Sequence, residues 1–309
     1  MRLLFPCLVI VIAAAPLGFA KEPPPPAPTT NAKSGGIDFA KSNDDLIVTA
    51  DQGIELSQDS KEAIARVNAK AVHGNSTVQG DTLTAYYRPK GEDPNKPPPP
   101  KADKQDAEQG SSSEIWRVVA DGSVEIYTPT QHAYGDHADY NIDDAVVVMT
   151  GDHLKMTTPQ DVITARDTLE YWENKHQAVA RGNAVAVQGE KRIQADLLVA
   201  DFAENAQKQL VIHIAHGYDH VVLTTATDVV TGDRADYVVE TGIVTVTGSV
   251  KMTRQNNQMD GERAVVNLNT GISTLYSTAP GSKKGTGQVR GLFVPQKKNS
   301  TQPAAPKAQ

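Results

Sequence analysis

Carboxylate side chains recur along the chain at a regular spacing, and carboxylates are groups that can carry general acid–base chemistry. The recurring acids are Asp81, Asp136, Asp167, Asp196, Asp233 and Glu262. Catalysis by carboxylates needs a pair whose environments push the two pKa values apart. These acids instead occur once per repeated segment, beside a turn, where a carboxylate can accept hydrogen bonds from local backbone amides. Their pattern indicates a structural role, and no catalytic residue is predicted.

A second group, three histidines in the segment HIAHGYDH, could suggest a zinc site. They are His213, His216 and His220. On an extended strand His213 and His216 would point to opposite faces, because successive side chains alternate. The sequence also lacks the His-Glu-x-x-His, Gly-x-Ser-x-Gly and phosphate-loop patterns. We therefore interpret the histidines as polar strand and turn residues, and predict neither a metal nor a cofactor.

The first twenty residues, MRLLFPCLVIVIAAAPLGFA, have the pattern of a secretory signal peptide. Arg2 supplies the positive start, and Gly18 and Ala20 are the small residues that precede a cut after Ala20. A retained N-terminal helix is the alternative. Cys7 is the single cysteine of the chain, so cleavage would leave no thiol for a disulfide or a thiolate metal site. The pattern predicts a protein of an extracytoplasmic space.

The formal net charge of −7 argues against a nucleic-acid partner. After residue 20, no apolar run approaches the ~20 residues that span a bilayer. Segments 21–45, 89–113 and 296–309 are rich in Pro, Gly, Ser and charge, and we expect them not to fold. The folded repeat region would then comprise 46–88 and 114–295, with 89–113 as an insertion into one turn.

The recurring acids mark a repeat of about 30 residues, once the insertion is set aside. Each period reads as a hairpin, in which a strand that follows the acid leads through an Asn/Asp/Gly turn to a returning strand such as ARGNAVAV. We therefore predict an all-β fold of repeated antiparallel hairpins.

Alternation along these strands predicts one apolar face. The positions two, four and six after each acid are mainly apolar, and the intervening positions are mainly polar. Small alanines are frequent on the apolar face, and phenylalanine is scarce. This content is compatible with an apolar groove and equally with an ordinary close-packed core.

The strands resemble a known family. The segment DQGIELSQDSKEAIARVNAKAV with GDTLTAYY, the later segment TGDHLKMTTPQDVITARDTLEYWENKHQAVARGNAVAVQGEKRIQADLLVADF, and the ending GQVRGLFVPQKK are together similar to the OstA-like domain of the LptA family. This resemblance implies an elongated, twisted, open β-jellyroll with an apolar groove. It also implies a periplasmic, non-enzymatic bridge that carries lipopolysaccharide from the inner to the outer membrane.

The same resemblance implies where lipid and partners bind. The lipid A acyl chains would lie on residues of the apolar face: Leu46, Val48, Leu83, Tyr87, Ile126, Tyr140, Ile142, Tyr171, Phe202 and Tyr237. Assembly would be head to tail through open strand edges, with the first strand near Leu46–Ala50 and a last strand that carries Val289, Leu292 and Val294. Other copies, an LptC-type inner-membrane protein and an LptD-type outer-membrane protein would be the partners.

Two readings from other classes remain open at this point. A structural β-repeat protein, such as an adhesin or surface scaffold, would have a closed, dry core. A polysaccharide-active enzyme on a β-repeat would cleave carbohydrate. Glycolipid that purifies with the protein would favour transport over both.

Overall fold

The computed structural model describes residues 46–90, 113–206, 208, 210–278 and 288–294. In these residues the fold is eighteen β-strands and one 3-10 turn. The first strands are β1 (Leu46–Thr49), β2 (Gly53–Ser57), β3 (Glu62–His73), β4 (Ser76–Pro89), β5 (Ser113–Tyr127) and β6 (His132–Asn141). Next come β7 (Val146–Thr150), β8 (Lys155–Thr157), β9 (Val162–Thr164), β10 (Thr168–Trp172), the 3-10 turn η1 (Glu173–Lys175), β11 (Gln177–Gln188) and β12 (Lys191–Glu204). The last are β13 (Leu210–Thr224), β14 (Asp228–Val238), β15 (Ile243–Arg254), β16 (Asn257–Asn267), β17 (Ile272–Tyr276) and β18 (Arg290–Leu292).

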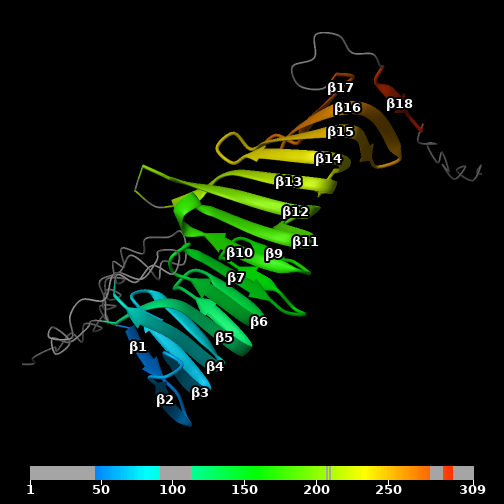
Figure 1. Ribbon diagram of the computed structural model, residues 1–309. Helices are drawn as coiled ribbons and strands as arrows, with labels where there is room; N and C mark the ends of the chain where they lie inside the picture. Colours follow the sequence, from blue (N-terminus) through cyan, green and yellow to red (C-terminus); the bar gives the residue numbers. More distant parts are fainter. Residues whose placement is uncertain (1–45, 91–112, 207, 209, 279–287, 295–309) are drawn as a thin grey trace, which may run out of the picture. The chain divides into compact units, whose positions relative to one another are not determined.

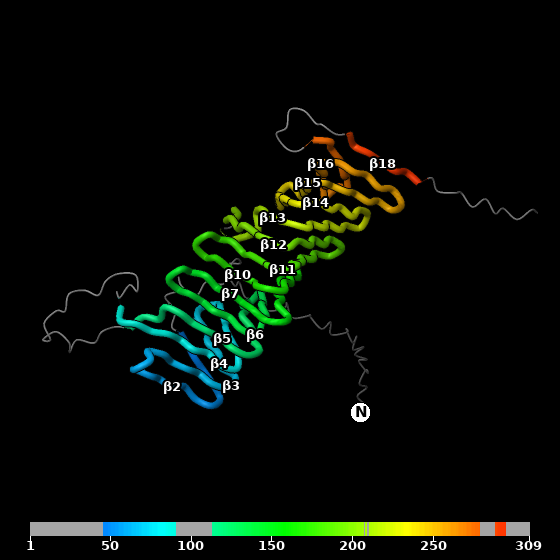
Figure 2. The backbone as a smooth tube through the Cα atoms, turned by 45° about the vertical axis from the view of Figure 1, so that its right-hand side comes forward, coloured from blue at the N-terminus to red at the C-terminus, as the bar shows by residue number. Residues whose placement is uncertain are grey.

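Nearly every strand pairs antiparallel with the next strand along the chain, so the hairpins stack in sequence order (Figure 1). The tube view in Figure 2 shows the same succession from β2 to β18. Five pairings skip at least one strand: β1–β3 and β16–β18 at the ends of the array, and β6–β8, β7–β10 and β9–β11 in the middle. The predicted all-β fold of repeated antiparallel hairpins is confirmed.

The long strands bend at their middle and thereby belong to two sheet layers. In β3, residues 62–66 pair with β2, whereas residues 70–73 pair with β1. In β16, residues 263–267 pair with β17, whereas residues 258–260 pair with β18. We call the layer that contains β2, β7, β10 and β17 the first layer, and the layer that contains β1, β8, β9 and β18 the second layer. The apolar residues lie between the two.

In β3, β5, β11, β13 and β15 the bend is a pair of residues in the left-handed backbone region, at a shift of the strand register. The pairs are Val67 and Asn68, Gly122 and Ser123, Gly182 and Asn183, Asp219 and His220, and Gly248 and Ser249. Glycine takes the first place in three of the five, because a left-handed φ costs an L-residue about 1–2 kcal/mol that glycine does not pay.

Four of the six recurring acids lie beside these corners. A Cβ on Gly122, Gly182 or Gly248 would meet the carboxylate of Asp81, Asp167 or Asp233, respectively. At a corner with no glycine, His220 Nδ1 and Asp196 Oδ2 are 2.8 Å apart. Asp136 lies instead beside Gly151 and accepts a backbone N–H from Asp152 at 2.8 Å, as local bonding predicts.

One further acid belongs to this series and was not recognised in the sequence. Asp51 accepts a hydrogen bond from Asn68 Nδ2 at 2.6 Å, beside the first corner. It precedes the first hairpin, so it has no preceding repeat with which it could be aligned.

The buried side chains form two clusters. One spans β3 to β11 and includes Leu83, Val124 and Met149; the other spans β12 to β16 and includes Val230 and Val246. The second cluster is rich in valine and is almost fully excluded from solvent, with Val230, Val246 and Ala264 each 0% exposed. It is a close-packed core.

Only some of the segments that the sequence predicts not to fold fall on described residues. The expected signal peptide, linker and basic tail lie outside the described residues, as does 91–112 of the expected insertion. Pro89 and Ser113, at the ends of that insertion, pair with each other at the tips of β4 and β5. No helix in the described part of the chain is long and apolar enough to cross a membrane.

Candidate functional site

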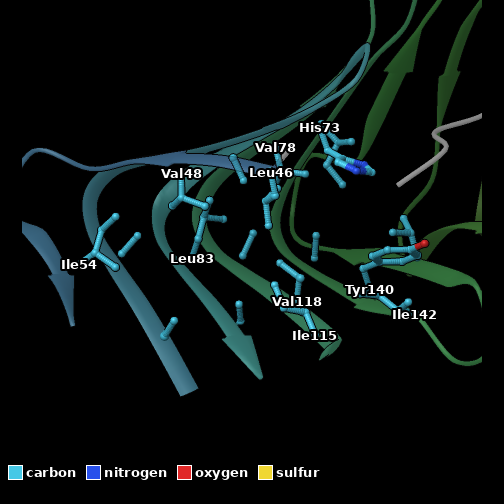
Figure 3. Close-up of a pocket in the computed structure, with 18 of the residues that line it drawn as sticks. Leu46, Val48, Ile54, His73, Val78, Leu83, Ile115, Val118, Tyr140 and Ile142 are labelled. Atoms are coloured by element: carbon cyan, nitrogen blue, oxygen red, sulfur yellow. The ribbon is translucent and has the colours of Figure 1, made fainter. Parts of the chain in front are cut away.

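An apolar pocket of about 420 Å³ lies between the two layers at the β1–β7 end of the array (Figure 3). The second layer contributes Leu46 and Val48 from β1, together with Ala71, His73, Val78 and Ile126. The first layer contributes Ile54 from β2, together with Ala63, Ala65, Leu83, Ala85, Ser113, Ile115, Val118, Ala120, Ala138, Tyr140, Ile142 and Val147. The pocket exists because both halves of the bent strands turn apolar side chains inward and many of these are alanines.

None of the described residues that line this pocket carries an acidic side chain, a lysine or an arginine. Its polar groups are those of Ser113, His73 and Tyr140. The Nδ1 atom of His73 is buried and has no hydrogen-bond partner among the described residues. The Tyr140 hydroxyl donates a hydrogen bond to Glu173 Oε1 at 3.1 Å. Such a lining suits an apolar ligand and offers no general acid–base pair.

The pocket is open at one end and closed at the other. At the open end Leu46 is 42% exposed and Ile54 is 48% exposed, and they come from the end strands β1 and β2. At the closed end Tyr140 and Val147 are buried, with 6% and 5% exposed. Figure 3 shows Tyr140 at the opposite end of the pocket from Ile54. A ligand would therefore enter from the free end of the array.

A smaller cavity of about 40 Å³ shares one lining residue with this pocket. Val147 lines it as well, with Met149, Leu169, Tyr171 and Phe202. The rings of Tyr171 and Phe202 meet edge to face, with centroids 6.2 Å apart.

The predicted groove residues thus fall into three groups. Those that line the large pocket are Leu46, Val48, Leu83, Ile126, Tyr140 and Ile142. Tyr171 and Phe202 line the small cavity. Tyr87 and Tyr237 line neither: Tyr87 donates a hydrogen bond to the Ser57 carbonyl at 2.7 Å, and Tyr237 packs against the second cluster, where burial raises its pKa.

Several pocket residues were not predicted, above all Ile54, Val78, Ile115 and Val118. Ile115 and Val118 lie on the returning strand β5, beside the insertion. Alternation before the corner at Gly122 was the available signal for Val118, but the apolar face was predicted from the positions that follow each recurring acid.

Charged groups lie on the outer faces of the layers. Arg117 and Asp139, cross-strand neighbours on β5 and β6, form a two-pronged ion pair with N–O distances of 2.8 and 2.5 Å. The hydrogen bonds to Asp139 raise the pKa of Arg117. Because Asp139 and Tyr140 are adjacent in β6, the polar outer face and the apolar pocket are separated by one sheet.

The three histidines do not converge on a common point. His216 bridges Asp236 at 2.6 Å and Asp201 at 3.2 Å, and His220 contacts Asp196. His213 lies 3.8 Å from Glu240. Within the described ranges, no group of three or more His, Cys, Asp or Glu side chains could hold a metal ion.

The array ends in two strands at each end, where the sequence predicted one. β1 and β2 lie at one end and β17 and β18 at the other, and each pairs with one neighbour among the described strands. In the last segment Val289, Leu292 and Val294 are exposed by 42%, 64% and 47%. The Val294 amide donates to Asn257 Oδ1 at 3.1 Å, which ties this segment to β16.

Comparison with known proteins identifies relatives of this fold. A family model described as LptA/(LptD N-terminal domain) LPS transport protein matches twice, over residues 47–171 and 163–272. No curated protein matches the chain. Among solved structures, one that is similar is LptH, described as the LptA homologous periplasmic component of the conserved lipopolysaccharide transport device from Pseudomonas aeruginosa. It is 17% identical, the match covers 44% of this chain and 95% of that chain, and the TM-score is 0.37.

Proposed function

The chain belongs to the LptA/LptD N-terminal domain family of lipopolysaccharide transport proteins, and on that premise we propose that it is a periplasmic bridge protein that binds the acyl chains of lipopolysaccharide. The observation that carries this proposal is the uncharged pocket between the layers, open at the free end of the array. The proposed action is binding and transfer, without a chemical step.

The physical reason is the cost of exposing acyl chains to water, about 0.8 kcal/mol per methylene. A lipid with several chains therefore needs continuous apolar cover when it crosses an aqueous compartment. The lining of Leu, Val, Ile and Ala side chains supplies such cover, and the sugar and phosphate groups would remain at the open side in solvent.

The size of the pocket determines how much of the lipid one molecule can cover. At about 420 Å³ it lies near the lower end of the ~300–1,000 Å³ of sites for small ligands. It would hold only part of a multi-chain lipid. An adjoining molecule at the open end would cover the remainder.

We infer that this neighbour joins by strand addition at the ends of the array. Within the described ranges β1 pairs only with β3 and β18 only with β16, and an open strand edge is a template for another strand. Exposed apolar side chains accompany them, among them Ile47 at 59% and Phe293 at 68%. Another copy, an LptC-type protein or an LptD-type protein would be the neighbour, each contributing one strand and extending the apolar surface.

The proposal can be tested by photo-crosslinking the ligand to a residue that lines the pocket. A photo-crosslinking residue at Leu46, which lines the pocket mouth, should capture glycolipid from cells, to be identified by mass spectrometry. Ile47 is the matched control, because it is adjacent in β1 and exposed but does not line the pocket. Equal capture at both positions would refute the pocket assignment, and absence of glycolipid from the purified protein would favour a structural scaffold.

A further inference from the structure

The ring of Tyr140 lies with Val147 at the closed end of the pocket, and its hydroxyl is bonded to a residue that does not line the pocket. Tyr140 lies on β6, paired with Val118 of β5 and Val147 of β7. Its hydroxyl donates to Glu173 Oε1 at 3.1 Å. Glu173 begins η1 and is itself only 5% exposed. In Figure 3 the ring of Tyr140 lies beside Ile142, at the opposite side of the drawn residues from Ile54, and its oxygen points away from Leu83 and Val118.

The position of Glu173 is set by the backbone. Its N–H donates to the carbonyl of Ala145 at 2.9 Å, which ties η1 to the turn before β7. A carboxylate held by its own main chain is a defined acceptor, and a buried hydroxyl that loses its acceptor is penalised by about 1–3 kcal/mol. The ring of Tyr140 is therefore held in one orientation.

The second cavity meets the pocket at Val147, which lines both spaces and is the cross-strand partner of Tyr140. Tyr140 lines only the large pocket. Removal of the Tyr140 ring would therefore enlarge the large pocket at this end, beside Val147.

We propose that Tyr140, positioned by Glu173, is the residue that sets the length of acyl chain that the pocket accepts. This inference rests on the proposed function, because it concerns how the same pocket selects its ligand. The selected class is an unbranched saturated acyl chain that enters at Leu46 and Ile54 and ends against the Tyr140 ring. Glu173 is a positioning residue, since it acts through Tyr140.

The proposal predicts a limit in chain-length dependence. Each additional methylene buried in the pocket should tighten binding about fourfold. Once the end of the chain reaches Tyr140, a further methylene finds no apolar cover in the pocket and the gain should cease. The wild-type protein should therefore show a plateau in affinity at a defined chain length.

The experiment measures displacement of a fluorescent fatty-acid analogue from the full-length protein by saturated fatty acids of increasing length. In Tyr140→Leu, which keeps an apolar side chain of smaller size, the plateau should move to longer chains by at least two carbons. In Val118→Phe, which narrows the pocket before the wall, it should move to shorter chains. The second variant adds bulk where the first removes it, so each tests the wall independently.

Two further variants separate the anchor from general stability. Glu173→Leu removes the acceptor and should move the plateau in the same direction as Tyr140→Leu. Glu173→Gln keeps an acceptor oxygen and should retain the wild-type plateau, although both variants change a buried group. A purely structural role of Glu173 would weaken all chain lengths alike and leave the plateau where it is.

Tyr237→Leu is the matched control. Tyr237 occupies the same place in its repeat, four residues after Asp233 as Tyr140 is after Asp136, but it lines neither cavity. Its replacement should leave the plateau unchanged. An unchanged plateau in both Tyr140→Leu and Val118→Phe, or an equal shift in Tyr237→Leu, would overturn the proposal while leaving lipid binding intact. Failure of the wild-type protein to bind any chain would overturn the proposed function as well.

Discussion

Gly122→Ala should damage both stability and ligand binding, because Gly122 forms the corner of β5 beside the pocket. Its φ is +77°, and a Cβ there would lie 2.8 Å or less from Cγ and Cβ of Asp81. A left-handed φ costs alanine about 1–2 kcal/mol, and overpacking adds about 1–3 kcal/mol. The lower entropy of the unfolded chain returns about 0.4–1 kcal/mol. We expect a net loss of about 2–3 kcal/mol in the free energy of unfolding.

Two other glycines serve as controls. Gly189 has φ +56° and nothing within 4 Å of the added Cβ, so Gly189→Ala carries the backbone penalty alone and should lose about 1 kcal/mol or less. Gly248 has φ +84° and the carboxylate of Asp233 behind it, so Gly248→Ala should lose as much stability as Gly122→Ala. It lies far along the array from the pocket residues, and only Gly122→Ala should weaken lipid binding.

The assay is thermal and urea unfolding followed by circular dichroism, combined with the fatty-acid displacement measurement. The double variant Asp81→Ala/Gly122→Ala should recover part of the loss, because it removes the carboxylate that the new Cβ meets and leaves only the Cβ of residue 81 close to it. If Gly122→Ala is no worse than Gly189→Ala, the close approach of corner and carboxylate is not energetically important. If Gly248→Ala weakens lipid binding as much as Gly122→Ala, the corner does not act through the pocket.

The remaining predictions concern the edge, one buried ion pair and the pocket mouth. Leu292→Pro removes a backbone donor from β18 and should shift the protein towards monomer in sedimentation velocity. Self-association like that of the wild type would show that the contact between copies lies elsewhere. Burial alone would raise the pKa of Asp228, but hydrogen bonds from Arg254 at 2.5 and 2.6 Å and from Ser273 at 2.6 Å lower it below its ordinary value. The stability that the Asp228 carboxylate contributes is therefore full above the unfolded pKa of about 3.9 and is lost as pH falls through the lowered folded pKa. Asp228→Asn should lower the free energy of unfolding by about 2–3 kcal/mol at neutral pH, and its melting temperature should depend less on pH below about pH 4. A pH dependence parallel to that of the wild type would contradict this. Ile54→Glu, at the exposed mouth, should weaken lipid binding at least tenfold with little change in melting temperature, whereas Leu56→Glu, in the same strand but not in the pocket lining, should leave affinity unchanged.

Much of the fold was predictable because the same types of residue recur at the turns and bends of successive hairpins, where the backbone conformation favours them. Asp81 and Asp233 lie at corners of the fold, and the alternation after Asp81 and Asp136 predicts that Leu83 and Tyr140 face inward, as their burial confirms. The bend itself was not predictable from the same pattern. A strand that passes through Gly122 and Ser123 keeps its alternation on both sides, so the sequence reads as one straight strand, although its two halves belong to different layers.

The location of the pocket was less predictable than its chemistry. Leu83 and Tyr237 look alike in the pattern of alternation, yet one lines an open space and the other a packed core. What separates them is how well the opposite layer fills the space. Alanines such as Ala63, Ala71 and Ala85 leave room at one end, while Val230, Val244 and Val246 fill it at the other. This complementarity joins residues that are distant in the sequence and cannot be read from one strand.

The order of the strands also bears on how the chain acquires its structure. Because almost every pairing joins neighbours in the sequence, most contacts close short loops, and each hairpin depends mainly on the hairpins beside it. Such an array can grow by adding one hairpin at a time to a folded neighbour, and it can fray in the same way from its ends. The pairings β1–β3, β6–β8 and β16–β18 each skip one strand, whereas β7–β10 and β9–β11 together join several short strands in the middle of the array. Folding should therefore meet its slowest closure in the middle of the array, and amide hydrogens there should be the last to exchange.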